Sequence, residues 1–178
     1  MTATSRRPDV PISEAIDVNR IWTPWRMAFI RGEKAVNCIF CLKASETQDR
    51  ENFVVARAKF NLILLNIYPY TTGHLMIAPY VHQANLVQLE SEVTAEMMDL
   101  ARRATRVLRQ AYQTESFNIG MNIGAAAGAG ITDHVHLHVV PRWQGDSNFM
   151  PVLGDARLIP ETLDVTYDRL LQAGIDRD

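Results

Sequence analysis

The sequence predicts an α+β domain in which an antiparallel sheet of about five strands packs against one long helix and a shorter C-terminal helix. Several short segments are rich in branched and aromatic residues and are bounded by turn residues, which is typical of strands. A longer stretch repeats apolar residues every three or four positions, which indicates an amphipathic helix. The two strand-like segments that follow it are joined by a small, flexible loop and can pair as a hairpin.

Five segments are expected to form strands. Three of them precede the long helix and cover residues 53–57, 61–66 and 74–78. The other two follow it and cover residues 117–122 and 134–140. Turn signals at Gly73 and Pro79 bound the third segment. The last segment alternates between polar and apolar residues from His134 to Val139, as expected for a strand with two different faces.

The long helix is expected over residues 91–113, and a short helix over residues 161–173. Apolar residues with helical spacing are expected to face the core. They are Met97, Leu100, Ala101, Ala104, Val107, Leu108 and Ala111. Four arginines form the solvated side of the same helix. They are Arg102, Arg103, Arg106 and Arg109.

The composition is that of one ordinary globular domain. The chain has 178 residues, of which 47% are hydrophobic and 21% charged. Its 18 basic and 20 acidic side chains lack the positive excess of a protein that binds nucleic acid polymers. No apolar run reaches the roughly 18 residues of a membrane span. Neither a nucleic acid polymer nor a membrane is therefore an expected partner.

The N-terminal residues are expected to differ from the rest of the chain. Residues 1–20 are polar, are interrupted by Pro8 and Pro11, and are expected to form a flexible arm before a single domain over residues 21–178. The arm lacks the apolar run of a signal peptide, so a cytoplasmic protein is expected. The aromatic segment 21–30 either covers the protein's own core or serves as a base-stacking or subunit-contact segment.

Three of the five histidines form a pattern that points to chemistry. His134, His136 and His138 alternate with apolar residues, so one strand face carries three imidazoles spaced about 6.6 to 7 Å apart along the backbone. Two chemistries fit this arrangement. One is a metal cluster, because imidazole is the commonest metal ligand. The other is nucleophilic catalysis, because an imidazole with a pKa of about 6.5 is largely neutral at pH 7.

The stretch DHVHLHVVPRW resembles the His-x-His-x-His-x-x signature of the histidine-triad (HIT) superfamily. Upstream, Asn66 and the pair Gly73-His74 are similar to a ribose-contacting Asn and a supporting Gly-His of that family. The similarity covers residues 38–142. It implies nucleotide binding, a covalent nucleotidyl intermediate on His136, and a homodimer in which the sheet continues from one chain to the other.

Within the family, the segments WTPWRMAFI, AAGAGITDH and PRWQGDSNFMPV are most similar to those of the bacterial diadenosine tetraphosphate phosphorylase branch. Two positions depart from patterns in the family. Gly130 stands where many members have a Gln or Ser that touches the leaving phosphate, and Asn122 stands where a dinucleoside hydrolase subgroup has Gln. The loop over residues 124–130 is either a mobile connector or a backbone cradle for phosphate oxygens, since glycine permits positive φ. The expected substrate contacts are Asn66, His74, Asn122, Gly128, Gly130 and Ile131.

The only two cysteines, Cys38 and Cys41, have the spacing of half a tetrahedral zinc site. His82 and His134 are the candidates for the two missing ligands. The resemblance supports this set, because zinc-carrying HIT proteins and the related galactose-1-phosphate uridylyltransferases use a Cys-x-x-Cys, a downstream His and the first triad His. Four protein ligands leave no open position, so a structural zinc is expected.

The leading expectation is an enzyme that transfers a nucleoside monophosphate group from diadenosine tetraphosphate, or a related dinucleoside polyphosphate, to inorganic phosphate. His136 is the expected nucleophile, and His138 the expected donor of a hydrogen bond to the phosphate or the leaving oxygen. The alternatives are a hydrolase of dinucleoside polyphosphates or nucleoside phosphoramidates, and a nucleotide sensor with little turnover. A metal hydrolase that uses the triad as ligands is disfavoured, because such sites usually recruit carboxylates as well.

Overall fold

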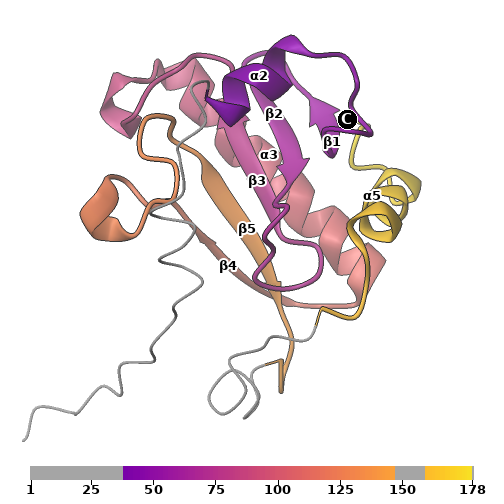
Figure 1. The fold of residues 1–178 in the computed structure, drawn as a ribbon. Helices are drawn as coiled ribbons and strands as arrows, with labels where there is room; N and C mark the ends of the chain where they lie inside the picture. The colour runs from indigo at the N-terminus through magenta and orange to yellow at the C-terminus, as the bar shows by residue number, and fades with distance from the viewer. Residues whose placement is uncertain (1–37, 147–158, 178) are drawn as a thin grey trace, which may run out of the picture.

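The computed structural model describes residues 38–146 and 159–177 (Figure 1). Five strands form one sheet in the order β1-β2-β3-β5-β4, and all neighbouring strands are antiparallel. The strands are β1 (Val54–Arg57), β2 (Asn61–Leu65), β3 (Leu75–Pro79), β4 (Ser116–Gly120) and β5 (Leu137–Arg142). The helices are α2 (Ile39–Ser45), α3 (Ser91–Tyr112) and α5 (Leu163–Gln172), with short 3-10 turns at Leu86–Gln88 and Ala125–Ala127. The predicted α+β fold and the β4–β5 hairpin pairing are confirmed.

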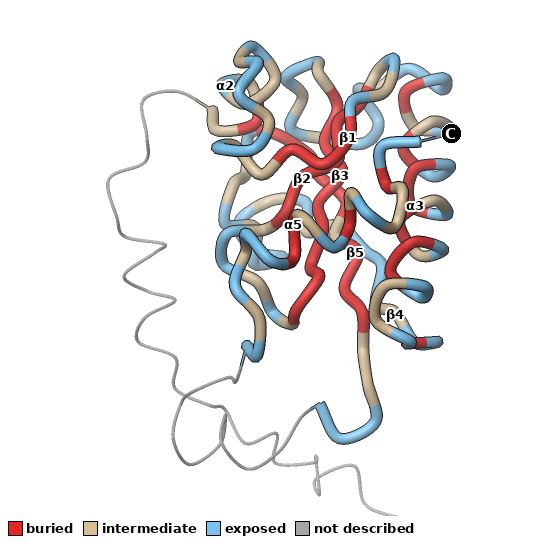
Figure 2. The backbone as a smooth tube through the Cα atoms, turned by 90° about the vertical axis from the view of Figure 1, so that its right-hand side faces the viewer, coloured by how far each residue is buried: buried red, intermediate tan, exposed pale blue. Residues whose placement is uncertain are grey.

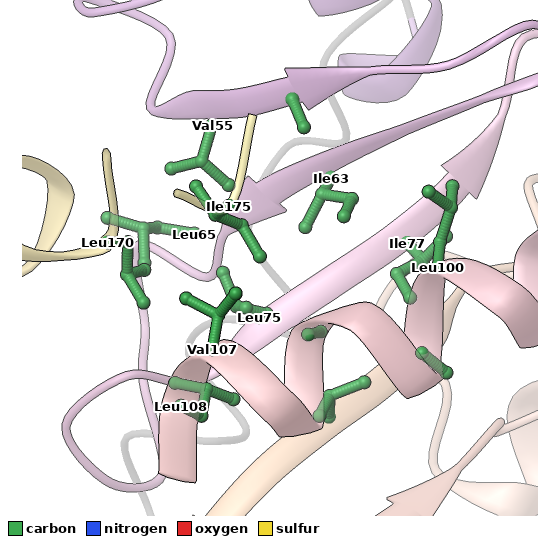
Figure 3. Packing of buried hydrophobic residues seen from close by; sticks show 14 of the residues in the cluster. Val55, Ile63, Leu65, Leu75, Ile77, Leu100, Val107, Leu108, Leu170 and Ile175 are labelled. Carbon is green, nitrogen blue, oxygen red and sulfur yellow. The ribbon is translucent and has the colours of Figure 1, made fainter. Parts of the chain in front are cut away.

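The long helix α3 covers one face of the sheet and forms the main core with it (Figure 3). Leu100, Val107 and Leu108 point from the helix toward the strands, where Leu75 and Ile77 are fully buried. Six of the seven apolar positions predicted for the helix are buried, whereas Ala111 is half-buried near the end. Tyr167 and Leu170 of α5 join the same cluster, so both predicted helices belong to this layer.

The opposite face of the sheet is covered by α2, and Figure 2 shows α2 and α3 on the two sides of the strands. Phe40 of α2 is fully buried in a second cluster with alternate residues of the first three strands. These residues are Val54, Leu62, Leu64, Met76 and Ala78. Both faces of β2 and β3 are therefore buried. The helix α2 was not predicted from the sequence.

The last strand starts later than the sequence pattern predicts. β5 begins at Leu137 rather than at residue 134, so His134 and His136 precede the strand. Pro79 of the neighbouring β3 has no N–H to donate, and its carbonyl accepts a hydrogen bond from the His134 ring instead (Nε2···O 2.9 Å). The N–H of Val135 donates to the carbonyl of Gln83 (2.7 Å), which also lies outside the sheet. The strand ladder therefore stops before it reaches these residues.

Other boundaries differ from the expected ones by a few residues, and β4 ends at Gly120, so Asn122 lies in the loop that follows it. The expected N-terminal arm over residues 1–20 and the aromatic segment 21–30 lie outside the described residues. Among the helices of the described part of the chain, none combines the length and the apolar character needed to cross a bilayer.

Candidate active site

Three imidazoles gather on the sheet face that α2 covers. His138 lies on β5 opposite Met76 of β3, and His74 immediately precedes β3. The His138 ring centroid is 5.1 Å from that of His74 and 4.8 Å from that of His136. His74 is 1% exposed and His136 is 5% exposed. The structure thus brings together the two triad histidines expected to carry the chemistry and the upstream histidine.

A chain of hydrogen bonds fixes which nitrogen of His138 carries a proton. The backbone N–H of Tyr70, which can only donate, points at Nδ1 of His74 (3.1 Å), so this nitrogen is the acceptor and the His74 proton sits on Nε2. That Nε2–H then donates to Nδ1 of His138 (2.9 Å). In neutral His138 the proton is therefore on Nε2, which makes this atom a hydrogen-bond donor.

His136 has the opposite arrangement. Its Nδ1 lies 2.9 Å from the backbone carbonyl oxygen of His134, and a carbonyl can only accept. Nδ1 therefore carries the proton, and Nε2 keeps the lone pair that a nucleophile needs. Neighbouring histidines of one motif are thus held in complementary states, with a lone pair on Nε2 of His136 and a proton on Nε2 of His138.

Burial keeps these imidazoles neutral. The pKa of His74 is lowered to about 3, first by desolvation and then by the charges of His138 and His136. Desolvation and the charge of His136 lower the pKa of His138 to about 4. The pKa of His136 is also lowered by desolvation, although its bond to the His134 carbonyl opposes this shift. Near neutral pH the three rings are uncharged, as the hydrogen-bond pattern requires.

The other residues expected to contact substrate occupy the loops around the histidines. Asn66 follows β2, accepts a hydrogen bond from the N–H of Tyr68 (2.9 Å), and places its amide nitrogen 3.4 Å from Nδ1 of His74. Ile131 packs against the cluster around Phe40.

The glycine-rich loop leads from Asn122 toward the triad. Its 3-10 turn is flanked by Gly124 (φ +82°) and Gly128 (φ +81°), which use the conformational freedom expected of glycine. Gly130 is exposed and does not have a positive φ. Gly124 and Gly128 therefore set the backbone conformation of the loop. Gly130 lies at its far end, four residues before His134.

A cleft of about 350 Å³ adjoins His138, and we call it the β4–β5 cleft. Its polar walls come from Tyr70, Thr71, Asn118, Asn122, His138 and Arg142. Asn122 was expected at the site, whereas Tyr70, Asn118 and Arg142 were missed. A signal was present for Asn118, because within the predicted strand over residues 117–122 it lies four positions before Asn122 and so on the same predicted face.

Four metal-ligand side chains meet beside α2, and we call them the Cys/His cluster. The ligand atoms of Cys38, Cys41, His82 and His134 all lie within 4.8 Å of one another. Cys38 Sγ is 3.2 Å from His134 Nδ1, and Cys41 Sγ is 3.3 Å from His82 Nδ1. A tetrahedral zinc site with ordinary bond lengths places sulfur and nitrogen ligands about 3.5 Å apart, so these distances fit zinc.

The protonation pattern of His134 also fits a metal ligand. Its Nε2 faces the carbonyl oxygen of Pro79 and so carries the proton, which leaves the lone pair of Nδ1 directed at the two thiols. The side chain is fully buried, and desolvation lowers its pKa. The four residues predicted as zinc ligands are therefore assembled with compatible donor atoms.

The Cys/His cluster and the triad share structural elements. Phe40 lies between the two cysteines in the sequence, and its ring centroid is 5.1 Å from that of His134 and 4.8 Å from that of His136. The carbonyl that orients His136 belongs to His134, a member of the cluster. A group that holds the Cys/His cluster in place therefore also holds in place Phe40 and the His134 carbonyl, which both contact His136.

Comparisons with known proteins identify relatives of this chain. Residues 47–145 match the model of the HIT domain family. The chain is 37% identical to an AP-4-A phosphorylase of Mycobacterium tuberculosis over 87% of this chain and 84% of that protein. It is 32% identical to an adenosine 5'-monophosphoramidase of Saccharomyces cerevisiae over 59% of this chain and 62% of that protein.

Among solved structures, a zinc-bound histidine triad family protein of Mycobacterium smegmatis is similar in fold, with a TM-score of 0.63 and 29% identity. The similarity covers 77% of this chain and 92% of that one. A hypothetical histidine triad nucleotide-binding protein of Sulfolobus tokodaii has a TM-score of 0.62 at 22% identity, which supports the fold alone.

Proposed function

The chain belongs to the HIT family, and we propose that it is a nucleotidyltransferase that cleaves diadenosine tetraphosphate, or a related dinucleoside polyphosphate, with inorganic phosphate as the acceptor. The observation that carries this proposal is the pairing of a lone pair on Nε2 of His136 with a proton on Nε2 of His138. The similarity to the AP-4-A phosphorylase supports the choice of substrate and acceptor.

In the proposed reaction, Nε2 of His136 attacks the phosphorus next to one nucleoside. A bond forms between this nitrogen and phosphorus, and the bond from phosphorus to the oxygen of the leaving nucleoside triphosphate breaks. Nε2–H of His138 donates a hydrogen bond to that oxygen as negative charge develops on it. The imidazole of His136 becomes cationic, and the carbonyl of His134 stabilises the charge through Nδ1–H.

In the second step an oxygen of inorganic phosphate attacks the nucleotidyl phosphorus, and the bond to His136 breaks. The imidazole returns to its neutral state, and the product is a nucleoside diphosphate. Water is present at about 55 M, so phosphate at millimolar concentration must prevail through positioning, and effective molarities of about 10⁵ M or more are available to well-oriented groups.

The remaining assignments of substrate contacts belong to the same proposal. Asn66 contacts a ribose hydroxyl of the transferred nucleotide, and Ile131 contributes an apolar contact. Gly128 and Gly130 keep the loop poor in side chains, so that phosphate oxygens can approach its backbone closely, although the N–H of Gly128 itself donates to the carbonyl of Ala125 (3.0 Å). Charge-assisted hydrogen bonds of this kind hold a phosphate more strongly than a neutral water.

The Cys/His cluster is proposed to hold a structural zinc through Cys38, Cys41, His82 and His134. The zinc-bound relative from Mycobacterium smegmatis supports the choice of metal. Bound zinc would supply folding energy, because two thiolates and two imidazoles complete its coordination.

A homodimer is also part of the proposal. β4 lies at the edge of the sheet, and Ile119 on this strand is 46% exposed. An edge strand with unpaired backbone groups is the element through which a sheet can continue into a second copy of the chain.

A second candidate function is hydrolysis of a nucleoside phosphoramidate. The similarity to an adenosine 5'-monophosphoramidase favours it, and the same two nitrogens serve it, with water as the acceptor. Because both candidates share the step on His136, only the identity of the leaving group and the acceptor separates them.

Product analysis tests the proposal. With diadenosine tetraphosphate and phosphate varied from zero to millimolar concentrations, we expect ADP beside ATP, formed at a rate that rises with phosphate. AMP beside ATP, at a rate independent of phosphate, would contradict phosphorolysis and favour a hydrolase. Rapid quenching should trap a nucleotide on His136, and His136→Asn should lose the trapped species and turnover while it still binds AMP.

A further inference from the structure

The sheet face that carries the triad continues past His138 into the β4–β5 cleft. On β5, Val140 and Arg142 follow His138 at steps of two residues and so lie on the same face. On β4, Gly120 pairs with His138 and Asn118 pairs with Val140. The cleft is lined by His138, Asn118 and Arg142, whereas His136 is absent from its walls among the described residues. It therefore begins at the hydrogen-bond donor of the triad and extends away from the nucleophile.

The direction of the cleft matches the direction in which the leaving group departs in the proposed reaction. In a phosphoryl-transfer step the attacking atom and the leaving oxygen lie on roughly opposite sides of phosphorus. With His136 on one side and His138 at the leaving oxygen, the rest of the leaving group continues beyond His138. Arg142 lies four residues farther along the strand, about 13 Å at the usual rise per residue. A chain of several phosphates is long enough to follow this path.

Arg142 is held in a fixed orientation toward the cleft. Its Nε and Nη2 donate to the carboxylate of Asp146 (2.6 and 2.8 Å), and its Nη1 donates to the amide oxygen of Asn118 (2.8 Å). A guanidinium has five N–H groups, so two remain available within the described part of the chain. The side chain is 40% exposed, while that of Asp146 is 12% exposed. The two N–H groups are therefore oriented in advance for an oxygen-rich ligand.

Tyr70 forms an aromatic wall at the entrance of the cleft. Its ring stacks on His138 at an interplanar angle of 25° and a centroid distance of 5.9 Å, yet the residue remains 41% exposed. Its backbone N–H also begins the chain of hydrogen bonds that orients His138. The same residue thus borders the path of the leaving group and fixes the donor that the leaving oxygen meets.

We infer that the β4–β5 cleft is the subsite for the leaving nucleoside polyphosphate, and that Asn118 and Arg142 are specificity-determining residues that contact it. This inference rests on the proposed function and deepens it. A substrate with a small leaving group does not extend into the cleft, so these two residues discriminate between substrates by the part that departs. The acceptor phosphate approaches from the same side, because it must take the place of the leaving oxygen.

The test compares two substrates that share the transferred nucleotide and differ in the leaving group. Diadenosine tetraphosphate has a long leaving group, and adenosine 5'-phosphoramidate has a leaving amine. We expect Asn118→Ala and Arg142→Gln each to lower kcat/KM for the tetraphosphate by about 10- to 100-fold, the usual cost of losing hydrogen bonds to a charged ligand. For the phosphoramidate, we expect kcat/KM to change less than about threefold.

Arg106→Gln is the matched control, because this arginine is exposed on α3 and lies on the other side of the sheet. It should change neither value. Equal losses on both substrates in the two cleft variants would overturn the inference, since they would show that the residues act through the triad. Unchanged values on both substrates would overturn it as well. The Asn118 variant keeps the bidentate pair of Arg142 with Asp146, so it remains informative if the Arg142 variant folds poorly.

A binding measurement separates failure of this inference from failure of the proposed function. ATP carries phosphates beyond the one next to its nucleoside, and AMP does not. Calorimetric titration should show ATP binding weakened about 10-fold by Asn118→Ala or Arg142→Gln, with AMP binding unchanged. If the unmodified protein turns over neither substrate, the proposed function fails, but the ratio of ATP to AMP affinity still decides the inference. Parallel losses for both nucleotides would overturn it.

Discussion

The buried, neutral state of His74 predicts a specific loss of stability in mild acid. This side chain is 1% exposed, and its pKa is lowered from the ordinary value of 6.5 to about 3. The unfolded chain therefore binds a proton at this residue at a much higher pH than the folded chain does. The stabilisation is fully present above pH 6.5 and decreases as the pH falls from 6.5 toward 3.

The size of this effect follows from the pKa difference. At pH 5 the unfolded imidazole is almost fully protonated, while the folded one is neutral. Each pH unit over which this holds changes the free energy of unfolding by about 1.4 kcal/mol, so the decrease from pH 7 to pH 5 contributes about 2 kcal/mol for His74 alone. At a denaturant dependence of about 2 kcal/mol per molar urea, the unfolding midpoint falls by about 1 M.

The measurement compares urea unfolding of the unmodified protein and His74→Gln at pH 7 and pH 5. Gln lacks a titrating group but keeps an N–H donor near the position of Nε2 that faces His138. Acid effects at the Cys/His cluster and at the carboxylates occur in both proteins and cancel in the comparison. We expect the unmodified protein to lose about 2 kcal/mol more than the variant. Equal losses would refute the buried, neutral state of His74.

Two further predictions concern stability. Cys38→Ala should lower the zinc content well below one per chain and should lower the melting temperature while AMP binding changes little, because a structural metal contributes folding energy. Metal analysis and thermal unfolding check this, and melting that does not depend on zinc in either protein would contradict it. Gly73→Ala should destabilise the fold by about 1–3 kcal/mol, because the residue has φ +77° and an added Cβ would lie 3.0 Å from Leu108 and 3.2 Å from Tyr112. Gly145→Ala is its control, since that position has φ +80° but no neighbouring atom within 4 Å, and equal urea midpoints for the two variants would rule out the contact as the cause.

Most of the fold could be predicted from the sequence because most of it follows from periodic patterns. The spacing of residues such as Met97, Ala104 and Leu108 on α3 reports a helix face that packs against a sheet, and that face is buried. The alternation of Leu137 and Val139 with the histidines of the motif likewise identifies the side of β5 that joins the main core. Such patterns reflect only which side chains are buried, and the order of apolar and polar residues in the sequence is enough to recognise them.

The helix α2 could not be predicted in this way because its stability is tertiary. It spans seven residues and has no side-chain hydrogen bond at its N-cap, so in isolation a helix of this length is marginal. Instead, Phe40 is buried against the second cluster, and the guanidinium of Arg57 donates to the carbonyls of Lys43 and Glu46 at the end of the helix. Neither contact has a signal in the local sequence.

The difference between His136 and His138 was assigned from family resemblance alone, and the structure supplies its physical cause. The two residues are two positions apart in one motif, so periodicity places them on the same face and makes them equivalent. What distinguishes them are two backbone groups: the carbonyl of His134, which holds a proton on Nδ1 of His136, and the N–H of Tyr70, which acts through His74 on Nδ1 of His138. The first group is free for this role because the strand ladder stops before His136. The strand prediction is wrong at residues 134–136 because the pairing between β3 and β5 stops at Leu137. The same early stop therefore allows His136 to present a lone pair while His138 presents a proton.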